Sequence, residues 1–513
     1  MTREGLPYLL MIRRPLRGPT GSLGRGVTTV IAGASALALA ACASGVRPAH
    51  VTLPTAYEAP AGTQAISDAA LDRWWTIFGD DELNGLEDQA LKASPTAETQ
   101  EARLREAMAT RESTIWQTYP SGNFTGSVTR KHTTAIGGAP TSLAPIGGTT
   151  QNANGDFRVS WEFDFLGALN DERRSARLDF AATQFNIESA RASLVANVAD
   201  SYFQARGLAI ELADAQESLK IETELYRVAA LKAKLGLSAM ADADRIAGDL
   251  ALAKSQVDEL QASQHAAQRS LLILVGRGTD PVESLPLAAD VPNPPPLPEA
   301  VPGEILVRRP DVREADLRMR SAVLKTKLAK EQIFPNITIN PAIGIASSIA
   351  PGVGVLSLVP LILGSQVQTT NTSYWSYGAG ITQPVLDIPR LLQDAKAQGD
   401  RAEQAVISYE QAVQTAYGDA ENALVELSSD ERRIAILEDG EARSRRAYDA
   451  EQVKYKMGLD DVTAVLSAEQ SWRSNRSQLT AERVQALRRA VQTYKALGGG
   501  WDYQTTTTAA RTP

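Results

Sequence analysis

Two long stretches of the chain carry apolar residues at the three- and four-residue spacing of a helix face. They cover about residues 170–234 and 391–457, and neither contains proline. Phe185, Leu194 and Val198 belong to the apolar face of the first stretch. A helix of 65 residues spans about 100 Å. Because its apolar stripe needs neighbouring helices along its whole length, the pattern predicts long rods packed side by side.

Segments of low charge that precede each long stretch alternate between polar and apolar residues, as β-strands do; residues 157–165 alternate almost without exception. We expect a first hairpin at about 122–166, with a loop at 132–154, and a second at about 336–387, with a loop at 348–372. Strands of about ten residues have the length needed to cross a bilayer. Four strands cannot close a barrel, and open edges are not stable in lipid, so several chains must combine.

Residues 342–364 admit a second interpretation, because no charged residue occurs between positions 335 and 377. An apolar segment of this length is also compatible with a transmembrane helix. Pro351, Pro360 and four glycines argue against the helix. The segment also occupies the same place in the second half of the chain as the first hairpin does in the first half, which favours strands.

The chain repeats itself at an offset of 222 residues, where Lys234-Leu235-Gly236-Leu237 falls on Lys456-Met457-Gly458-Leu459. Gly236 and Gly458 each end a long helix and begin its return. The expected units are a first repeat at 66–290 with a return helix at 238–275, a proline-rich linker at 291–303, a second repeat at 304–501 with a return helix at 461–497, and a disordered tail at 502–513.

The N-terminus combines five arginines with an apolar run that ends in Leu39-Ala40-Ala41-Cys42. The run is too short for a membrane span and is typical of an export signal, expected here at 1–41. The tetrapeptide is similar to the bacterial lipobox, which implies cleavage before Cys42, N-palmitoyl and S-diacylglycerol groups on this cysteine, and a lipidated tether at 42–65. An ordinary secretory signal with a chance cysteine is the alternative, and Met11 is an alternative start to Met1.

Composition argues against several classes of function. The net charge of −8 becomes −12 once residues 1–41, with five arginines and one glutamate, are removed, and no basic run suggests nucleic-acid binding. The three histidines are scattered, so no metal site or catalytic triad is indicated. Gly498-Gly499-Gly500 lacks the lysine of a phosphate-binding loop. We therefore expect no enzyme and no cofactor beyond the lipid on Cys42.

Several motifs together resemble the TolC-like outer membrane factors, in particular the NodT- and OprM-like lipoprotein branch that serves resistance–nodulation–division (RND) efflux systems. The resemblance covers about residues 68–501. Its motifs are Trp74-Trp75-Thr76-Ile77-Phe78-Gly79-Asp80-Asp81-Glu82-Leu83, Arg308-Arg309-Pro310-Asp311-Val312-Arg313, Thr382-Gln383-Pro384-Val385-Leu386-Asp387 and Tyr494-Lys495-Ala496-Leu497-Gly498-Gly499-Gly500-Trp501.

The resemblance implies a mixed, mainly α fold with a two-fold internal repeat. Each protomer of a homotrimer would give four strands to a twelve-stranded β-barrel in the outer membrane. Its long helices would join a coiled-coil barrel that extends into the periplasm. The partners implied are a periplasmic adaptor (membrane fusion) protein, an inner membrane RND-type pump and outer membrane lipid, with no nucleic acid.

The resemblance also implies a gate at the helical tips around Gly236 and Gly458. Asp242 stands where the family often has an acid facing the lumen, and Tyr455 matches a gate tyrosine. The corresponding acid of the second half is replaced by Ser467, while Asp460 and Asp461 supply charge at a different height. A ring of carboxylates would attract cations. The alternative is that these acids are solvated residues at helix starts.

The function expected is a passive outer membrane exit duct for small molecules and drugs, driven by the pump through the adaptor. Two alternatives stay open. One is the outer membrane duct of a type I protein secretion system. The other is a structural envelope lipoprotein without a pore, which the paired hairpins disfavour because a spacer needs no strands.

Overall fold

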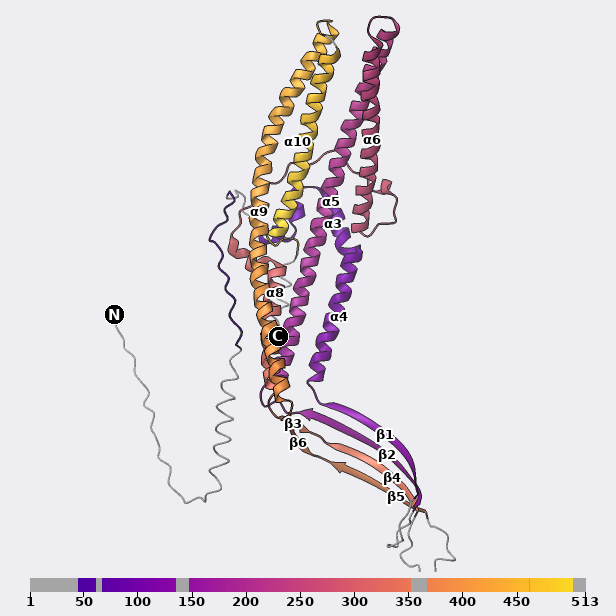
Figure 1. Ribbon diagram of the computed structural model, residues 1–513, viewed down its shortest axis with the longest axis vertical. Coiled ribbons are helices and arrows are strands. Elements are labelled where there is room, and N and C mark those ends of the chain that lie inside the picture. The colour runs from indigo at the N-terminus through magenta and orange to yellow at the C-terminus, as the bar shows by residue number, and fades with distance from the viewer. Residues whose placement is uncertain (1–44, 61–66, 135–146, 352–366, 461, 502–513) are drawn as a thin grey trace, which may run out of the picture.

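The computed structural model describes residues 45–60, 67–134, 147–351, 367–460 and 462–501. Its helices form a long bundle, and its strands form a curved sheet at one end of that bundle (Figure 1). The expected mainly α fold with a strand-bearing segment is therefore confirmed. The expected tail at 502–513 lies outside the described residues.

Four helices build the half of the bundle far from the sheet. The long helices are α5 (Ala168–Lys234) and α9 (Ile388–Lys456), and their return helices are α6 (Met240–Leu274) and α10 (Val462–Ala496). No proline interrupts the interior of α5, and Pro389 sits in the first turn of α9, where its missing N–H costs nothing. The contacts run in the order α6, α5, α10, α9, so that α6 and α9 form the open edges.

The half nearer the sheet replaces the return helices with α4 (Pro95–Gln117) and α8 (Pro310–Glu331). Both helices begin with proline, and the Ser94 hydroxyl caps α4 by accepting the Ala97 N–H at 3.0 Å. The contacts here run α4, α5, α8, α9, which leaves α4 and α9 at the edges. A hairpin, a long helix and a return helix thus follow each other twice along the chain.

The sheet contains six strands in the described residues: β1 (Ser121–Thr134), β2 (Gly147–Glu162), β3 (Asn336–Ile339), β4 (Ala342–Pro351), β5 (Val367–Ser376) and β6 (Ala379–Thr382). All pairs are antiparallel. β1 pairs with β2, β2 with both β3 and β4, β4 with β5, and β3 with β6. β3 with β4, and β6 with β5, form two long strands, each broken once. β1 and β5 are the edges of the larger part of the sheet.

The strands are longer than expected. The loop predicted at 132–154 is wrong for residues 132–134, which end β1, and for residues 147–154, which form part of β2. The loop predicted at 348–372 is wrong at both ends. Residues 147–155 include three glycines and two asparagines, which are depleted in strands, beside two threonines, which favour them. Pairing with β1 on one side and β4 on the other decides their conformation, because both neighbours supply backbone hydrogen-bond partners.

Residues 342–351 of the segment considered above as a transmembrane helix form β4, so the helix interpretation is wrong for this part. Residues 352–364 lie outside the described residues. Among the helices that the structure describes, none combines the length and the apolar character needed to cross a bilayer.

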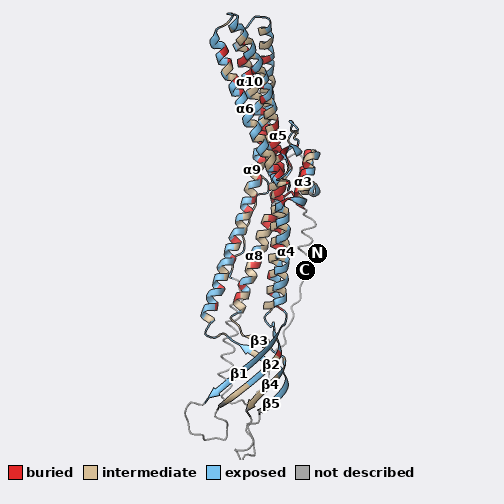
Figure 2. Ribbon diagram, turned by 90° about the vertical axis from the view of Figure 1, so that its right-hand side faces the viewer, coloured by how far each residue is buried: buried red, intermediate tan, exposed pale blue. Residues whose placement is uncertain are grey.

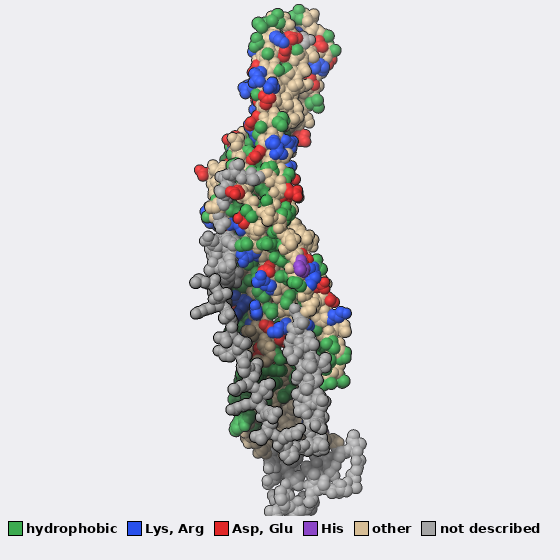
Figure 3. Space-filling model, turned by 90° about the vertical axis from the view of Figure 1, so that its left-hand side faces the viewer, with side chains coloured by type: hydrophobic (Ala, Val, Ile, Leu, Met, Phe, Trp, Pro, Cys, Tyr) green, Lys and Arg blue, Asp and Glu red, His purple; other side chains and the backbone are tan. Residues whose placement is uncertain are grey.

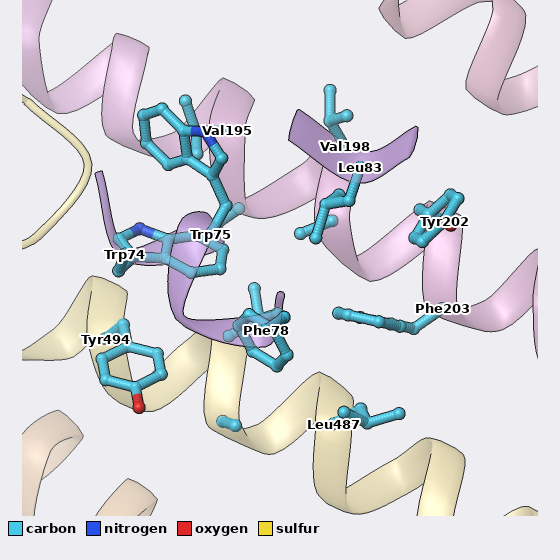
Figure 4. Packing of buried hydrophobic residues seen from close by; sticks show 14 of the residues in the cluster. Trp74, Trp75, Phe78, Leu83, Val195, Val198, Tyr202, Phe203, Leu487 and Tyr494 are labelled. Atoms are coloured by element: carbon cyan, nitrogen blue, oxygen red, sulfur yellow. The ribbon is translucent and has the colours of Figure 1, made fainter. Parts of the chain in front are cut away.

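The main hydrophobic core lies midway along the bundle, where short helices pack against it (Figure 2). The short elements are α2 (Asp68–Asp72), η1 (Trp74–Phe78), α3 (Asp81–Ala93), η2 (Val282–Ser284), η3 (Pro302–Glu304) and α7 (Ile305–Arg308). Trp74, Trp75 and Phe78 insert between α5 and α10 (Figure 4). Trp74 stacks on Tyr494 of α10 with ring centroids 5.8 Å apart. These aromatic residues therefore pack the core.

The N-terminal segment at 45–60 runs in an extended conformation along α9 (Figure 1). Arg47 donates two hydrogen bonds to Glu410, at 2.8 and 2.7 Å, and Tyr57 stacks on Tyr417 with centroids 5.5 Å apart. Further along, the backbone N–H of Ala59 donates to Glu421 at 2.8 Å. Glu410, Tyr417 and Glu421 lie on one face of α9, so the N-terminal segment covers that face.

Candidate functional site

Two turns of the same geometry close the bundle at the end far from the sheet. Gly236 has φ of 75° and Gly458 has φ of 73°, in the left-handed region that favours glycine. In each turn the residue after the glycine donates its N–H to a carbonyl five residues earlier, at 2.8 and 3.0 Å. The structure therefore places both predicted tip glycines in equivalent turns.

Apolar side chains around both turns are exposed, although they are large. Three of them occupy the first turn and two the second: Leu235, Leu237 and Met240, and Met457 and Leu459. On the face seen in Figure 3, charged side chains of both signs are scattered over the helical part of the surface. Exposed apolar tips of this kind are typical of surfaces that contact a partner.

Tyr455 lies one turn before the second tip and contacts the other long helix. The ammonium group of Lys232 on α5 donates to the Tyr455 hydroxyl at 3.2 Å and lies 5.1 Å from the centre of its ring. The contact is a hydrogen bond and a cation–π interaction at once. It joins the ends of α5 and α9 directly.

The predicted tip acids that the structure describes are exposed to solvent. Asp242 is exposed in the first turn of α6, and Asp460 is exposed in the turn before α10. Asp461 lies outside the described residues. Ser467 is exposed on α10. Carboxylates near a helix N-terminus are stabilised by the helix dipole, so both the gate interpretation and the turn interpretation predict acids here.

A buried ionic cluster lies about three to four helical turns from the tip glycines. Glu222 of α5 and Glu469 of α10 have side chains only 3% and 1% exposed, and both lie close to Arg473, at 3.8 and 3.9 Å. Arg245 and Asp249 of α6 also interact electrostatically with Glu222. A cavity of 430 Å³ borders the cluster between α5, α6 and α10. Two acids thus share one guanidinium at the contact between the two helix pairs.

Burial raises the pKa of Glu469 to about 7; Arg473 lowers it in part and Glu222 raises it further. Burial likewise raises the pKa of Glu222, with Asp249 adding to the rise and Arg473 and Arg245 opposing it. The physical cause is the same for both: a charged carboxylate loses water in the helix contact and recovers only part of that loss from a shared arginine.

The two faces of the sheet differ in chemistry. One cross-strand row consists of Phe124, Phe157, Ile343 and Trp375, which pair in that order and are all exposed. The neighbouring row, one residue along each strand and therefore on the opposite face, consists of Thr125, Asp156, Gly344 and Tyr374. An apolar face opposite a polar face is the pattern of a membrane barrel wall, with lipid outside and water inside.

Aromatic residues also gather where the strands approach the helices. Trp161, Phe163 and Phe165 are exposed at the end of β2, and Trp375 stacks on Tyr377 with ring centroids 5.9 Å apart. Aromatic girdles of this kind mark the interface between the hydrocarbon core and the headgroups. The apolar face and this girdle together define a membrane-crossing band on the sheet.

Neither the expected lipid site nor a metal site is placed by the structure. Cys42 lies outside the described residues. Within the described ranges, no group of three or more histidine, cysteine, aspartate or glutamate side chains is arranged to hold a metal ion.

A family model described as outer membrane efflux protein matches residues 86–277 and 301–499, which is most of the chain. The chain belongs to the outer membrane efflux protein family. This finding confirms the resemblance drawn from the sequence motifs.

Curated relatives of this efflux protein span nearly its whole length. It is 25% identical over 472 residues to the pyoverdine export outer membrane protein OpmQ of Pseudomonas aeruginosa, covering 91% of this chain and 95% of that protein. It is 24% identical over 434 residues to the cation efflux system protein CusC of Escherichia coli K12, covering 83% and 88%.

Solved structures of outer membrane channels share the fold. The CmeC channel of Campylobacter jejuni matches with a TM-score of 0.75 at 19% identity, covering 91% of this chain and 98% of that one. The MtrE channel of Neisseria gonorrhoeae matches with a TM-score of 0.73 at 22% identity, covering 90% and 98%.

Sequence reasoning about this efflux protein missed Lys232, Glu222 and Glu469. A signal for Glu469 was present, because it follows Val465 and Leu466 by four and three residues and therefore lies within the buried stripe of α10. No comparable signal existed for Lys232, since its partner Tyr455 is 223 residues away.

Proposed function

We propose that three copies of this efflux protein form a passive exit channel for small molecules in the outer membrane. The observation that carries the proposal is the sheet, which has an apolar face, a polar face and two unpaired edges at β1 and β5. Unpaired strand edges are not stable in lipid, so β1 of one protomer pairs with β5 of the next.

Closure around a water-filled lumen requires at least three copies, and we propose three. Each protomer offers four strands side by side: β1, β2, β3 with β4, and β5 with β6. Four are too few to enclose even a packed interior, and about eight strands leave room only for side chains or one small ligand. Three copies give twelve strands, enough for a water-filled lumen through which small molecules pass.

The same symmetry closes the helices. Each level of the bundle has four helices and two open edges, α6 and α9 far from the sheet and α4 and α9 near it. Three copies place twelve helices around one axis and cover each edge of α9 with a helix of the neighbouring protomer. The barrel lumen then continues into a helical tunnel in the periplasm.

The tips are the docking end of this tunnel. Exposed apolar side chains at both turns, such as Leu237 and Leu459, suit contact with a periplasmic adaptor protein. The adaptor in turn links the channel to an inner membrane pump of the RND type, which supplies the energy for export.

Lipidation at Cys42 is part of the proposal. The segment at 45–60 is held along α9 and runs toward the sheet from residue 60 to residue 45 (Figure 1), which supports an anchor at the membrane end of the molecule. Mass spectrometry of the mature N-terminus tests this point: N-palmitoyl and S-diacylglycerol groups are expected on Cys42, and an unmodified cysteine overturns the anchor.

Efflux of small solutes is favoured over type I protein secretion. Relatives that align along most of this chain are named for export of pyoverdine, for cation efflux and for toluene efflux. Deleting the gene should therefore raise susceptibility to toxic small molecules and leave the secreted proteins unchanged. The reverse pattern supports the secretion alternative.

The first test is the mass of the detergent-purified protein by light scattering, corrected for bound detergent. A trimer that conducts ions in a planar bilayer is expected. A stable monomer overturns the shared barrel, and a trimer without conductance favours the spacer alternative.

A further inference from the structure

The polar face of the sheet carries one ion pair, in the part of the larger sheet nearer the helices. Arg158 on β2 donates from Nε to the Asp156 carboxylate at 2.6 Å. The Asp156 side chain is 3% exposed, whereas the Arg158 side chain is 67% exposed. The carboxylate is therefore buried against the sheet, and the guanidinium extends from the sheet into solvent.

This pair is isolated from other charges. Among the strand residues that the structure describes, the remaining lysine, arginine, aspartate and glutamate side chains are Arg130, Lys131 and Glu162, which lie toward the two ends of the sheet. β3, β4, β5 and β6 carry none in their described residues. Between these positions, Arg158 is thus the protruding charge of the polar face.

Tyr374 completes the arrangement from two strands away. Asp156, Gly344 and Tyr374 pair in one cross-strand row. A Cβ on Gly344 would lie 2.6 Å from the Tyr374 ring, so the ring lies directly over this glycine and next to the acid. Tyr374 also lies close enough to Arg158 to interact with its guanidinium. The guanidinium is therefore held at Nε by a carboxylate and flanked by a phenol.

An arginine held in this way is suited to bind an anion. Its donors form a rigid fork that matches a carboxylate or phosphate, and fixing the side chain beforehand reduces the entropy lost on binding. Asp156 offsets the charge of the pair as a whole, but it is buried, so the end that meets solvent is positive.

We infer that Arg158, positioned by Asp156 and Tyr374, is an anion-recognition point in the barrel lumen, and that the channel favours solutes bearing carboxylate or phosphate groups at this level. The inference rests on the proposed channel, because only barrel closure turns the polar face into a lumen. Three copies then place three guanidinium groups around one axis, and rings of arginine are a known basis of anion selectivity in pores.

The test uses the purified full-length protein in a planar bilayer, with pyrophosphate as the probe added to the barrel side. We expect pyrophosphate to reduce the current. Replacing Arg158 by Gln should raise the half-blocking concentration by at least about tenfold, since a charge-assisted hydrogen bond contributes roughly 1.5–3 kcal/mol. Arg158→Lys, which keeps the charge and loses the fork, should give an intermediate value.

Arg130→Gln is the matched control. Arg130 lies on the same sheet but on the apolar face, two residues along β1 from Val128, so its removal should leave the block unchanged. Equal block in wild type and Arg158→Gln overturns the inference while leaving the channel intact, and so does an equal loss in Arg130→Gln. A protein that conducts no current overturns the proposed channel and the inference with it.

Discussion

Lys232 and Tyr455 meet at the ends of the two long helices, with the ammonium group 3.2 Å from the phenol oxygen and 5.1 Å from the ring centre. Lys232 belongs to α5 and Tyr455 to α9, so the contact bridges the two helix pairs beside their turns. Any outward rotation of α9 and α10 relative to α5 and α6 must break it. We therefore expect the pair to act as a latch on the tip of the proposed tunnel.

Removal of the latch should open the channel more often. Lys232→Ala loses the hydrogen bond and the cation–π contact, whereas Tyr455→Phe loses only the hydrogen bond. Each contact contributes about 1 kcal/mol, which corresponds to about a fivefold rise in open probability. Single-channel recording should rank wild type lowest, Tyr455→Phe next and Lys232→Ala highest.

Arg227→Ala is the control for this ranking. Arg227 also lies on α5, but its partner Glu224 is on the same helix, at 3.0 Å, so its loss breaks no bridge between the helix pairs. Equal open probabilities for Arg227→Ala and Lys232→Ala would show that charge, and not the latch, governs opening.

Glu469 should make the stability of the bundle depend on pH. Its folded pKa of about 7 lies above the ordinary 4.5, because burial and Glu222 disfavour the charged form more than Arg473 favours it. The folded state thus holds its proton more tightly than the unfolded state. Stability falls as pH rises from about 4.5 to about 7, by on the order of 3 kcal/mol per protomer, and then levels off.

Glu469→Gln removes this ionisation and should flatten the decline. Thermal unfolding of the detergent-purified protein at pH 5 and pH 8 measures it: the variant should gain stability over wild type at pH 8 and little at pH 5. Asp449→Asn, an exposed acid on α9, should leave both values unchanged. An identical pH dependence in wild type and Glu469→Gln would show that ionisation of Glu469 does not destabilise the folded bundle.

Gly276 should tolerate alanine far less well than Gly236. Both glycines have positive φ, of 80° and 75°, so alanine costs roughly 1–2 kcal/mol in backbone energy at either position. A Cβ at Gly276 would also lie 2.2 Å from the carbonyl oxygen of Ala93, whereas nothing lies within 4 Å at Gly236. The backbone at Ala93 must move to relieve the clash.

Comparing the unfolding temperatures of the two variants separates the cost of the steric clash from the cost of alanine at positive φ, which both variants share. Gly276→Ala should unfold at a clearly lower temperature than Gly236→Ala, by an amount corresponding to about 1–3 kcal/mol. Equal midpoints would mean that the segment carrying Ala93 is not packed against Gly276 as described.

Local sequence patterns predicted much of this architecture. Gly236 and Gly458 were recognisable because a left-handed turn after a long apolar stripe favours glycine, and because the same signal occurs twice. The residues that come together from different helices of the bundle were not recognisable in the sequence. Glu222 and Glu469 become buried only when α5, α6 and α10 meet, and β2 extends through weak strand formers only because β1 and β4 flank it.

Asp242 should contribute to cation preference at the tip. It is exposed in the first turn of α6, and three copies around one axis would face a narrow opening where the local field attracts cations. Asp242→Asn should reduce the preference for potassium over chloride by roughly twofold at low salt, and less at high salt because the charges are screened. The reversal potential in a salt gradient measures this change. Asp258→Asn, exposed on the same helix but more than four turns from the tip, should not alter it. An unchanged reversal potential in Asp242→Asn would favour the alternative that this acid only stabilises the start of its helix.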